Sequence, residues 1–461
     1  MKSLITFGKS RLAQGTAVGF YGLAMQLVVQ LLSVPVLTHS WGLAGYGAWV
    51  LLYSVPALLA MADLGLTTAG ANAMTAAVAR GDQPRAARIM MVLRLITVSA
   101  GLALFALAGL AILVLFPRSL DFGAVLPRDQ AVLTALALGL YGFLSLINGV
   151  TLAAFRAADA FASSGFMFQT IVLVEALAAL GLAMAGGNQA EVALAYLAAR
   201  LVGTVLLSWA LRRHAPWLRQ ASWRIDRGEL KALVRPALAA LILPGAQAIG
   251  IQGSVMAIGA VGGPAAIPAF SVVRTLSRTA LQFAFRFNIA SMPRYTVFIA
   301  QDNERRASQL VVLNLAVMAA LTVPAALGLL LLGQPFVRIW TGGLVQPGPA
   351  LIAVMVATML ADAAWGPLSN LLLAVNRHAS WTYFFLAASV VSVAAGAVLV
   401  GRMGALGMAW ALFGLEVVMI FQVWIVAWRH GTVSSERLRM GASTLIAELR
   451  HRRTSLDGPD T

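Results

Sequence analysis

Long runs of apolar residues, separated by short segments with charges, glycines or prolines, recur along almost the whole chain. An α-helix of roughly 20 apolar residues crosses the hydrocarbon core of a bilayer and satisfies its own backbone hydrogen bonds there. The runs are continuous in Ala, Leu, Val and Gly, so they lack the alternation that is typical of a membrane β-barrel. We therefore predict an all-α integral membrane protein with about twelve spanning helices. The predicted helices cover residues 13–38, 44–78, 92–116, 131–155, 165–186, 191–211, 236–261, 264–292, 308–333, 349–376, 379–401 and 404–428.

One of these divisions rests on a turn signal inside a long apolar stretch. The uncharged stretch from Pro236 to Val273 is too long for one crossing of the membrane. It contains Gly262, Gly263 and Pro264 in succession, and this order of residues is typical of a tight turn. We therefore predict two helices here, separated at these three residues.

The predicted helices fall into two blocks of six, divided by a basic segment from Arg212 to Arg235. The fourth and tenth helices carry weakly similar segments in corresponding places, which begin at Asn148 and Asn370. Two parallel halves around a central cavity are a recurring design in transporters. The predicted organisation is an N-terminal six-helix lobe over residues 1–211, a basic cytoplasmic linker over 212–235, a C-terminal six-helix lobe over 236–428 and a basic cytoplasmic tail over 429–461.

The distribution of basic residues predicts the orientation of the chain in the membrane. The formal net charge is +16, but the arginines lie between the apolar runs and form no groove interleaved with aromatic residues, which argues against nucleic acid as a partner. If both termini are cytoplasmic, most basic loop residues fall on the cytoplasmic side, as the positive-inside rule requires. We therefore predict a multi-pass membrane protein with cytoplasmic termini. Four basic residues fall on the opposite side: Arg118, Arg128, Arg338 and Arg402.

The eighth predicted helix carries a stripe of polar residues where polarity is costly. Arg274, Arg278, Gln282 and Arg286 occupy every fourth position, and this spacing drifts only about 40° per step around a helix. A charged stripe inside the bilayer has to face water or an anion, and arginine binds phosphate oxygens through paired hydrogen bonds. We predict that the stripe binds the phosphate-bearing head group of a substrate. Alternatively, Arg286 extends to the cytoplasmic edge and the other arginines pair with acids on neighbouring helices.

Four carboxylates interrupt otherwise uncharged helices: Asp63, Glu175, Asp362 and Glu416. Carboxylates in apolar surroundings can take up and release protons, so these residues are candidates for coupling transport to an ion gradient. Glu175 in the fifth helix and Arg200 in the sixth are expected at similar depth on adjacent helices. The alternative for Glu175 is therefore an ion pair with Arg200.

Other polar residues are spaced as if they lined a cavity. Gln26 and Gln30 lie one turn apart in the first predicted helix, and Asn148 lies in the fourth. Together with Arg200 they are predicted to line the cavity. Small and polar residues also allow helices to pack closely in lipid, so packing is the alternative for each of them.

The loop after the first predicted helix carries a motif that is similar to one in a known family. Residues 41–49 read Trp-Gly-Leu-Ala-Gly-Tyr-Gly-Ala-Trp, and residues 62–65 read Ala-Asp-Leu-Gly. This opening resembles that of the Wzx-type polysaccharide and O-antigen flippases, which belong to the multidrug, oligosaccharidyl-lipid and polysaccharide (MOP) exporter superfamily. The detailed sequence similarity covers residues 35–75, and the predicted arrangement of twelve helices in two lobes is similar over the whole chain.

The resemblance implies a substrate and a way of moving it. Two six-helix lobes would form a central cation-rich cavity that opens alternately to the two sides of the membrane. The implied substrate is an undecaprenyl-diphosphate-linked oligosaccharide, moved from the cytoplasmic to the periplasmic leaflet of the bacterial cytoplasmic (inner) membrane. The implied pathway is the biosynthesis of a surface polysaccharide such as O-antigen or exopolysaccharide. Expected partners are this substrate, membrane lipids, and polysaccharide polymerase and chain-length proteins, with no cofactor. Basic residues of the family's cavity correspond in kind to Arg274 and Arg278, although this chain has no lysine in any predicted helix.

Two other classes of membrane protein are alternatives. An ion-coupled antiporter of drugs and organic cations in the same superfamily would share the architecture, but its cavity should be rich in acids and aromatic residues. A membrane-embedded polysaccharide polymerase or ligase would carry catalytic groups on a large external loop, and the predicted external loops are short. The chain has no cysteine and shows no zinc-protease, Ser-His-Asp or phosphate-loop motif. We therefore predict that it is neither an enzyme nor a metalloprotein.

Overall fold

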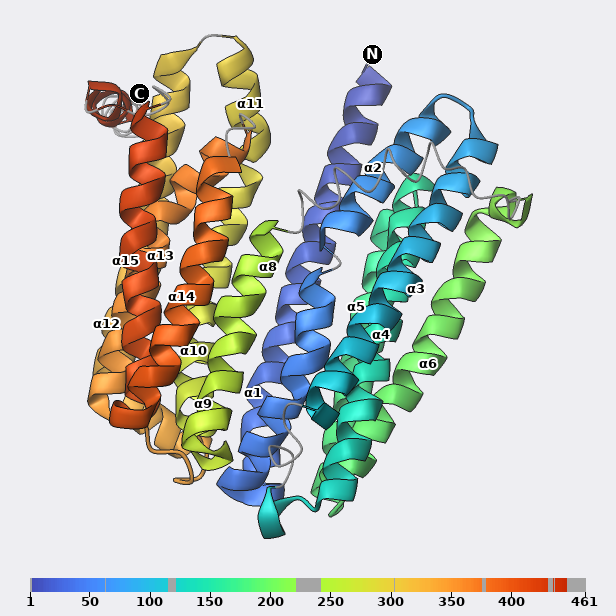
Figure 1. The fold of residues 1–461 in the computed structure, drawn as a ribbon. Helices are drawn as coiled ribbons and strands as arrows, with labels where there is room; N and C mark the ends of the chain where they lie inside the picture. Colours follow the sequence, from blue (N-terminus) through green and yellow to red (C-terminus); the bar gives the residue numbers. More distant parts are fainter. Residues whose placement is uncertain are drawn as a thin grey trace, which may run out of the picture. The chain divides into compact units, whose positions relative to one another are not determined.

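The described part of the chain consists of helices joined by turns and short loops (Figure 1). The computed structural model describes residues 2–62, 64–114, 122–220, 242–301, 303–374, 379–429, 434 and 436–445. No strand occurs within these ranges, so the predicted all-α class is confirmed. The chain forms two compact units, Met1–Pro268 and Ala269–Thr461, which we call unit 1 and unit 2.

Within its described residues, unit 1 is a helix bundle in which α4 packs against the other five long helices. The long helices are α1 (Lys2–Ala62), α2 (Leu64–Ala79), α3 (Gln83–Val114), α4 (Arg128–Ala157), α5 (Phe161–Met184) and α6 (Gln189–His214), with 3₁₀ turns η1 (Gly123–Val125) and η2 (Pro216–Gln220). The start of α6 is fixed by a capping box. The Asn188 side chain accepts a hydrogen bond from the backbone N–H of Glu191 (3.0 Å), and the Glu191 carboxylate accepts one from the backbone N–H of Asn188 (2.9 Å). The last turn of α6 carries three basic residues, which suits the negative end of a helix dipole.

The label α1 covers two helices that meet at Gly42. The backbone of Gly42 has φ 70° and ψ −179°, a conformation outside the helical region that glycine adopts without strain. This break falls between the predicted helices 13–38 and 44–78 and confirms their separation. The second predicted helix corresponds to the part of α1 after Gly42 together with α2.

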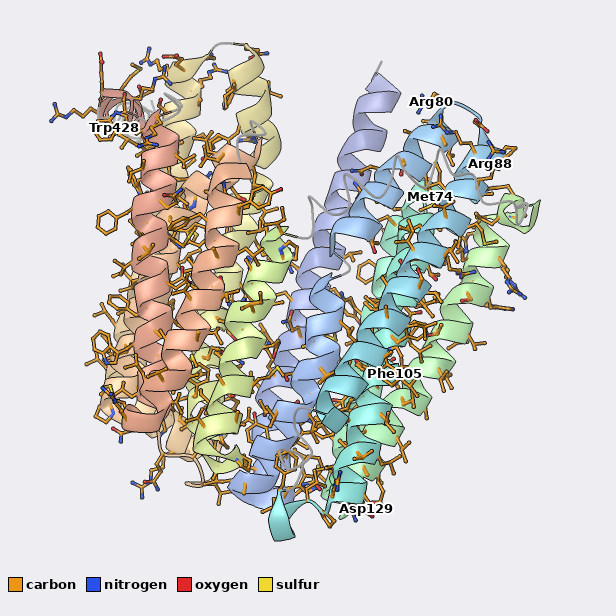
Figure 2. The ribbon with its side chains drawn as sticks, viewed as in Figure 1. Met74, Arg80, Arg88, Phe105, Asp129 and Trp428 are labelled. Atoms are coloured by element: carbon orange, nitrogen blue, oxygen red, sulfur yellow. The ribbon has the colours of Figure 1, made fainter. Side chains whose placement is uncertain are left out.

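One end of unit 1 has a compact apolar core below a basic surface. Met74, Leu93, Phe155 and Leu207 come from α2, α3, α4 and α6, and all are almost fully buried. Figure 2 places Arg80 and Arg88 at this end, near the α2–α3 turn, and Asp129 at the opposite end of the bundle. The basic residues near the α2–α3 turn agree with the charge pattern that predicts the orientation, while the side of the membrane stays a prediction.

The last elements of unit 1 confirm the predicted split at the Gly-Gly-Pro sequence. They are α8 (Ile242–Ala248), a π-helical turn η3 (Ile249–Gly253), α9 (Ser254–Gly262) and the 3₁₀ turn η4 (Pro264–Ala266). Gly263 has φ 77° and ψ 169°, so the helix ends there and a new one starts after Pro264. The elements α8, α9 and η4 all pack against α1.

The glycine-rich motif of residues 41–49 is shaped by two close approaches. A Cβ atom on Gly47 would lie 1.9 Å from the carbonyl oxygen of Pro264, so only glycine allows α1 and η4 to touch here. The indole nitrogen of Trp41 donates a hydrogen bond to the carbonyl oxygen of Gly187 (2.9 Å), and the Trp41 ring lies 5.3 Å from the ring of Trp49. The motif therefore joins α1 to η4 and to the α5–α6 turn.

Unit 2 contains six helices within its described residues, besides a short helical segment at residues 436–445. Neighbouring helices α12, α13, α14 and α15 form its main body, with α13 and α14 both packed on α15. The six helices are α10 (Ile267–Ala290), α11 (Met292–Ala300), α12 (Glu304–Trp340), α13 (Pro349–Ala374), α14 (Ala379–Met403) and α15 (Ala405–Arg429).

Two helix ends in unit 2 differ from the prediction. The helix predicted over 308–333 runs from Glu304 to Trp340, because Pro335 is tolerated inside it just as Pro324 is. The external loop between the predicted helices 308–333 and 349–376 is correspondingly shorter. The segment 436–445 docks on the start of α12, where Arg437 pairs with Glu304 and Arg305 donates a hydrogen bond to Thr444 (3.2 Å). Part of the predicted cytoplasmic tail is thus a helix that packs on unit 2.

Ten helices within the described residues are long and apolar enough to cross a membrane. The first of them, Ala17–Ala57, has 41 residues and contains the break at Gly42, so it contributes to two predicted crossings. The helix α10 has 24 residues and three arginines and is not among the ten. Counting both parts of α1 and adding α10 gives about twelve crossings, as the sequence predicts.

Replacing Gly47 tests the close approach of α1 and η4. Gly47→Ala should lower the stability of the protein by roughly 1–3 kcal/mol, because the new methyl group overlaps a backbone oxygen that cannot rotate away. Gly19→Ala is the matched control, since nothing lies within 4 Å of a Cβ atom at that position of α1. The apparent melting temperature of purified protein in detergent measures the effect. Equal melting temperatures for the two variants would contradict the packing described.

Candidate functional site

The predicted arginine stripe lies on one continuous helix of unit 2. The helix α10 is unbroken from Ile267 to Ala290, so its every-fourth-residue spacing places Arg274, Arg278, Gln282 and Arg286 along one face. Arg274 and Arg278 are half-buried, whereas Arg286 is exposed. The side-chain oxygen of Gln282 is buried and has no hydrogen-bond partner among the described residues.

Two predicted carboxylates of unit 2 lie within electrostatic reach of this stripe. Arg278 interacts with Asp362 on α13 and with Glu416 on α15, and the two carboxylates also act on each other. Both carboxylates are half-buried. From the sequence, we predict that Arg278 binds the head group and that Asp362 and Glu416 couple transport to ions. The structure brings these three residues into one charged cluster.

Trp365 connects Glu416 to a group of aromatic residues. The Trp365 indole donates a 2.8 Å hydrogen bond to Glu416, and the Trp365 ring lies 5.8 Å from Trp381 and 5.7 Å from Phe385. Trp381 is 1% exposed, and its indole nitrogen has no partner among the described residues. Trp381 and Phe385 come from α14 and were not predicted, because a single sequence does not show which faces of α13 and α14 meet.

Close packing brings α10 and α13 together near this cluster. A Cβ atom on Gly366 would lie 2.6 Å from the ring of Phe285, so the absence of a side chain at Gly366 gives Phe285 its space. Gly366 is four residues beyond Asp362, one turn further along α13. This contact holds the two helices near each other at the depth of the charged residues.

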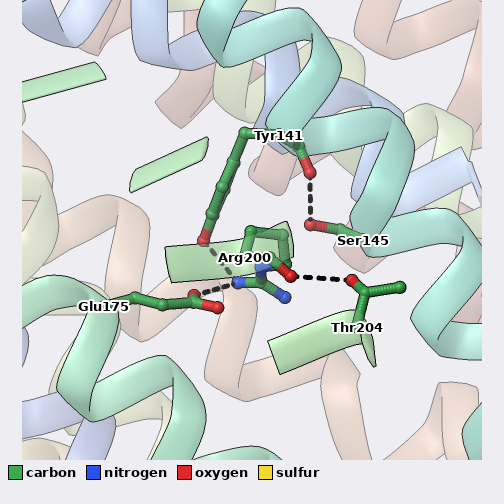
Figure 3. Close-up of polar contacts among 5 residues, drawn as sticks. All are labelled: Tyr141, Ser145, Glu175, Arg200 and Thr204. Carbon is green, nitrogen blue, oxygen red and sulfur yellow. Dashed lines mark hydrogen bonds and ion pairs between the residues drawn. The ribbon is translucent and has the colours of Figure 1, made fainter. Parts of the chain in front are cut away.

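Unit 1 contains the ion pair between Glu175 and Arg200 that the sequence offers as the alternative to ion coupling by Glu175. The Arg200 Nη2 atom lies 2.6 Å from Glu175 Oε2 and also donates a 2.6 Å hydrogen bond to the hydroxyl of Tyr141 (Figure 3). Only 1% of the Glu175 side chain and 3% of the Arg200 side chain are exposed. The guanidinium carbon of Arg200 also lies 4.4 Å from the centre of the Tyr141 ring.

Further tyrosines extend this buried group, and sequence reasoning missed them. Tyr141 lies 5.5 Å from Tyr196 and 6.5 Å from Tyr53, measured between ring centres. Tyr53 in turn stacks on Trp49 at 5.9 Å. These residues belong to three different helices, so their meeting follows from packing and leaves no signal in local spacing.

The other predicted residues are scattered. Asn148 is fully buried, and neither atom of its amide has a hydrogen-bond partner among the described residues. Gln26 is exposed on α1 and Gln30 is half-buried. Asp63 lies outside the described residues. Within the described ranges, no cluster of three His, Cys, Asp or Glu side chains could hold a metal ion.

Comparison with solved structures identifies the class of fold. No family model matches the sequence, and no curated protein matches it by sequence. An inward-facing multidrug resistance MATE family transporter of the MOP superfamily superposes with a TM-score of 0.68 at 15% identity, over 90% of this chain and 98% of that one. The lipid II flippase MurJ, in an inward closed conformation, gives 0.65 at 13% identity, over 97% and 93%. A MOP superfamily transporter from Pyrococcus furiosus, described by a reversed polarity of its binding pocket, gives 0.63 at 14% identity, over 94% and 96%.

The chain therefore has the fold of MOP superfamily transporters and flippases. At these identities the likeness establishes the fold, whereas the finer resemblance to Wzx-type flippases stays a prediction. The predicted absence of enzymatic activity also stays a prediction, in agreement with neighbours that are transporters and flippases.

Breaking the buried ion pair of unit 1 tests its role in stability. Arg200→Met should destabilise the protein by about 3–5 kcal/mol, because it leaves the Glu175 carboxylate buried without its counter-charge. The double variant Glu175→Met/Arg200→Met removes both charges and should recover most of this loss. Apparent melting temperatures in detergent compare the variants. A double variant as unstable as the single one would show that the charge of Glu175 is not the cause.

Proposed function

We propose that the protein is a flippase that moves an undecaprenyl-diphosphate-linked oligosaccharide from the cytoplasmic to the periplasmic leaflet of the bacterial inner membrane. Alternating access would carry the head group across during biosynthesis of a surface polysaccharide. The proposal is supported by the MOP transporter fold, by the likeness to the lipid II flippase MurJ, and by the local resemblance of residues 41–49 to Wzx-type flippases.

The observation that carries the proposal is the arginine stripe on α10. Each charged side chain near the middle of a bilayer costs about 3 kcal/mol on insertion scales, so three arginines on one helix face need a compensating partner. A diphosphate offers at least two negative charges and several acceptor oxygens. Two guanidinium groups one helical turn apart, at Arg274 and Arg278, match such a group better than two lysines would.

The charged cluster of unit 2 offers a way to couple transport to ions. Arg278 acts on Asp362 and Glu416, so a substrate diphosphate and these carboxylates would compete for the same guanidinium. Head-group binding would then change the occupancy of the carboxylate pair by a proton or another cation. In this proposal the exposed Arg286 attracts the head group near the helix end, and polymerase and chain-length proteins are later partners of the same pathway.

Removing the arginines tests head-group binding. The double variant Arg274→Ala/Arg278→Ala should abolish export of the lipid-linked sugar, because the phosphate loses both guanidinium partners. Arg→Lys at the same positions should restore export only partly, since the charge returns without the planar fork. Cell-surface glycan is measured together with the amount of protein in the membrane, and Arg402→Ala on the exposed end of α14 is the matched control. Wild-type glycan from the double alanine variant at normal expression would refute this role.

Neutralising the carboxylates tests ion coupling. Asp362→Asn and Glu416→Gln keep the shapes of the side chains and remove their charge, so each should reduce glycan export severalfold. In the double variant, the export that is left should no longer respond to an uncoupler of the proton gradient. Asp129→Asn, at the exposed start of α4, is the control. Normal, uncoupler-sensitive export from the double variant would exclude these carboxylates as the coupling groups.

Export of organic cations is a second candidate function, favoured by a different observation. Trp365 donates a hydrogen bond to Glu416 and packs on two further aromatic rings, and a carboxylate near aromatic side chains is a common arrangement in sites for organic cations. The MATE neighbours carry the same fold. An efflux-deficient strain distinguishes the two functions: a flippase leaves its sensitivity to organic cations unchanged, whereas an antiporter raises resistance in a way that Glu416→Gln abolishes and Arg274→Ala does not.

A further inference from the structure

The group around Arg200 in unit 1 has the chemistry of a cation-binding site. We name as the Arg200 cage the residues Glu175, Tyr141 and Phe168, which contact this side chain. Glu175 supplies a carboxylate oxygen and Tyr141 a hydroxyl oxygen, each 2.6 Å from the same Arg200 nitrogen. The rings of Tyr141 and Phe168 lie 4.4 Å and 5.6 Å from the guanidinium carbon. A carboxylate, a second acceptor and two aromatic faces are the groups that recognise a planar organic cation.

The cage is shielded from solvent and built from three helices. Tyr141 lies on α4, Glu175 and Phe168 on α5, and Arg200 on α6. The carboxylate and the guanidinium are at least 97% buried. Each keeps one atom without a hydrogen-bond partner among the described residues, namely Glu175 Oε1 and Arg200 Nε. A Cβ atom on Gly203 of α6 would lie 3.4 Å from Glu175 Oε1 and 2.5 Å from Ile171, so glycine at this position lets α6 come close to the carboxylate.

We propose that the Arg200 cage is a cation-binding site which the chain fills with its own Arg200 side chain. Because this cation is covalently tethered and keeps its charge at any working pH, no exchangeable ion can replace it. Glu175 is thereby removed from the candidates for ion coupling, and unit 1 has no free carboxylate in the cage. The inference is independent of which substrate the chain transports.

The consequence can be tested by removing the tethered cation and offering a free one. Arg200→Ala deletes the guanidinium and leaves the carboxylate, the hydroxyl and the aromatic faces in place. Guanidinium chloride at about 10 mM, far below the molar concentrations that unfold proteins, should then raise the apparent melting temperature of this variant by roughly 2 °C or more. Wild-type protein should show no such rise, because its cage is already occupied.

Controls separate binding in the cage from general effects of the salt. Urea and sodium chloride at the same concentration should not stabilise Arg200→Ala, because urea lacks the charge of guanidinium and the sodium ion lacks its planar shape. Arg156→Ala removes an exposed arginine at the end of α4 and should not respond to guanidinium. The double variant Glu175→Gln/Arg200→Ala should also lose the response, because the carboxylate is the main partner of the cation.

A second measurement covers the case in which Arg200→Ala does not survive purification. The variant is extracted with and without about 10 mM guanidinium, and the monodisperse fraction is measured by size-exclusion chromatography. An increase with guanidinium, absent for Glu175→Gln/Arg200→Ala, supports the proposal. No increase in either melting temperature or monodisperse fraction, or an equal response of the variant without Glu175, would overturn it.

Discussion

The cost of charge inside a membrane helix bundle is the constraint on which the rest of the structure depends. Each ionised side chain in a spanning helix must find a counter-charge, hydrogen bonds or water, or the helix will not insert stably. The ion pair of unit 1 meets this requirement internally, because Arg200 and Glu175 neutralise each other and Tyr141 accepts a further hydrogen bond. In unit 2, three arginines of α10 stand against the two carboxylates Asp362 and Glu416.

This difference in charge assigns different roles to the two units. A neutral, dry ion pair that ties α4, α5 and α6 together stabilises a bundle and has little chemistry to offer a substrate. In the proposed function, the arginine stripe of α10 binds an anion, and the acids near Arg278 connect this binding to protons or other cations. The proposed flippase function rests on the arginine stripe of α10, and the antiporter alternative rests on the hydrogen bond between Trp365 and Glu416.

The sequence predicted the fold through lengths of apolar runs, because the thickness of a bilayer fixes the length of a helix that crosses it. The breaks at Gly42 and Gly263 were predictable because glycine and proline mark turns. The end of α12 was not, since a proline near the end of an apolar run is compatible with either a loop or a continued helix. The pairing of Glu175 with Arg200 was predictable from similar depth on consecutive helices. The contacts of Trp365 with Trp381 and Phe385, and of Gly47 with Pro264, depend on which helix faces meet, and one sequence carries no record of that.

Direct measurement of lipid flipping tests the central claim. Purified protein is reconstituted into vesicles that contain a fluorescent diphosphate-linked oligosaccharide lipid in both leaflets, and a membrane-impermeant quencher reports the fraction that becomes accessible from outside. The account predicts that nearly all of this lipid becomes accessible, and that a neutral glycolipid with the same tail does not. Accessibility equal to that of protein-free vesicles, for protein that is folded and inserted, would contradict the assignment of the α10 arginines to a lipid diphosphate.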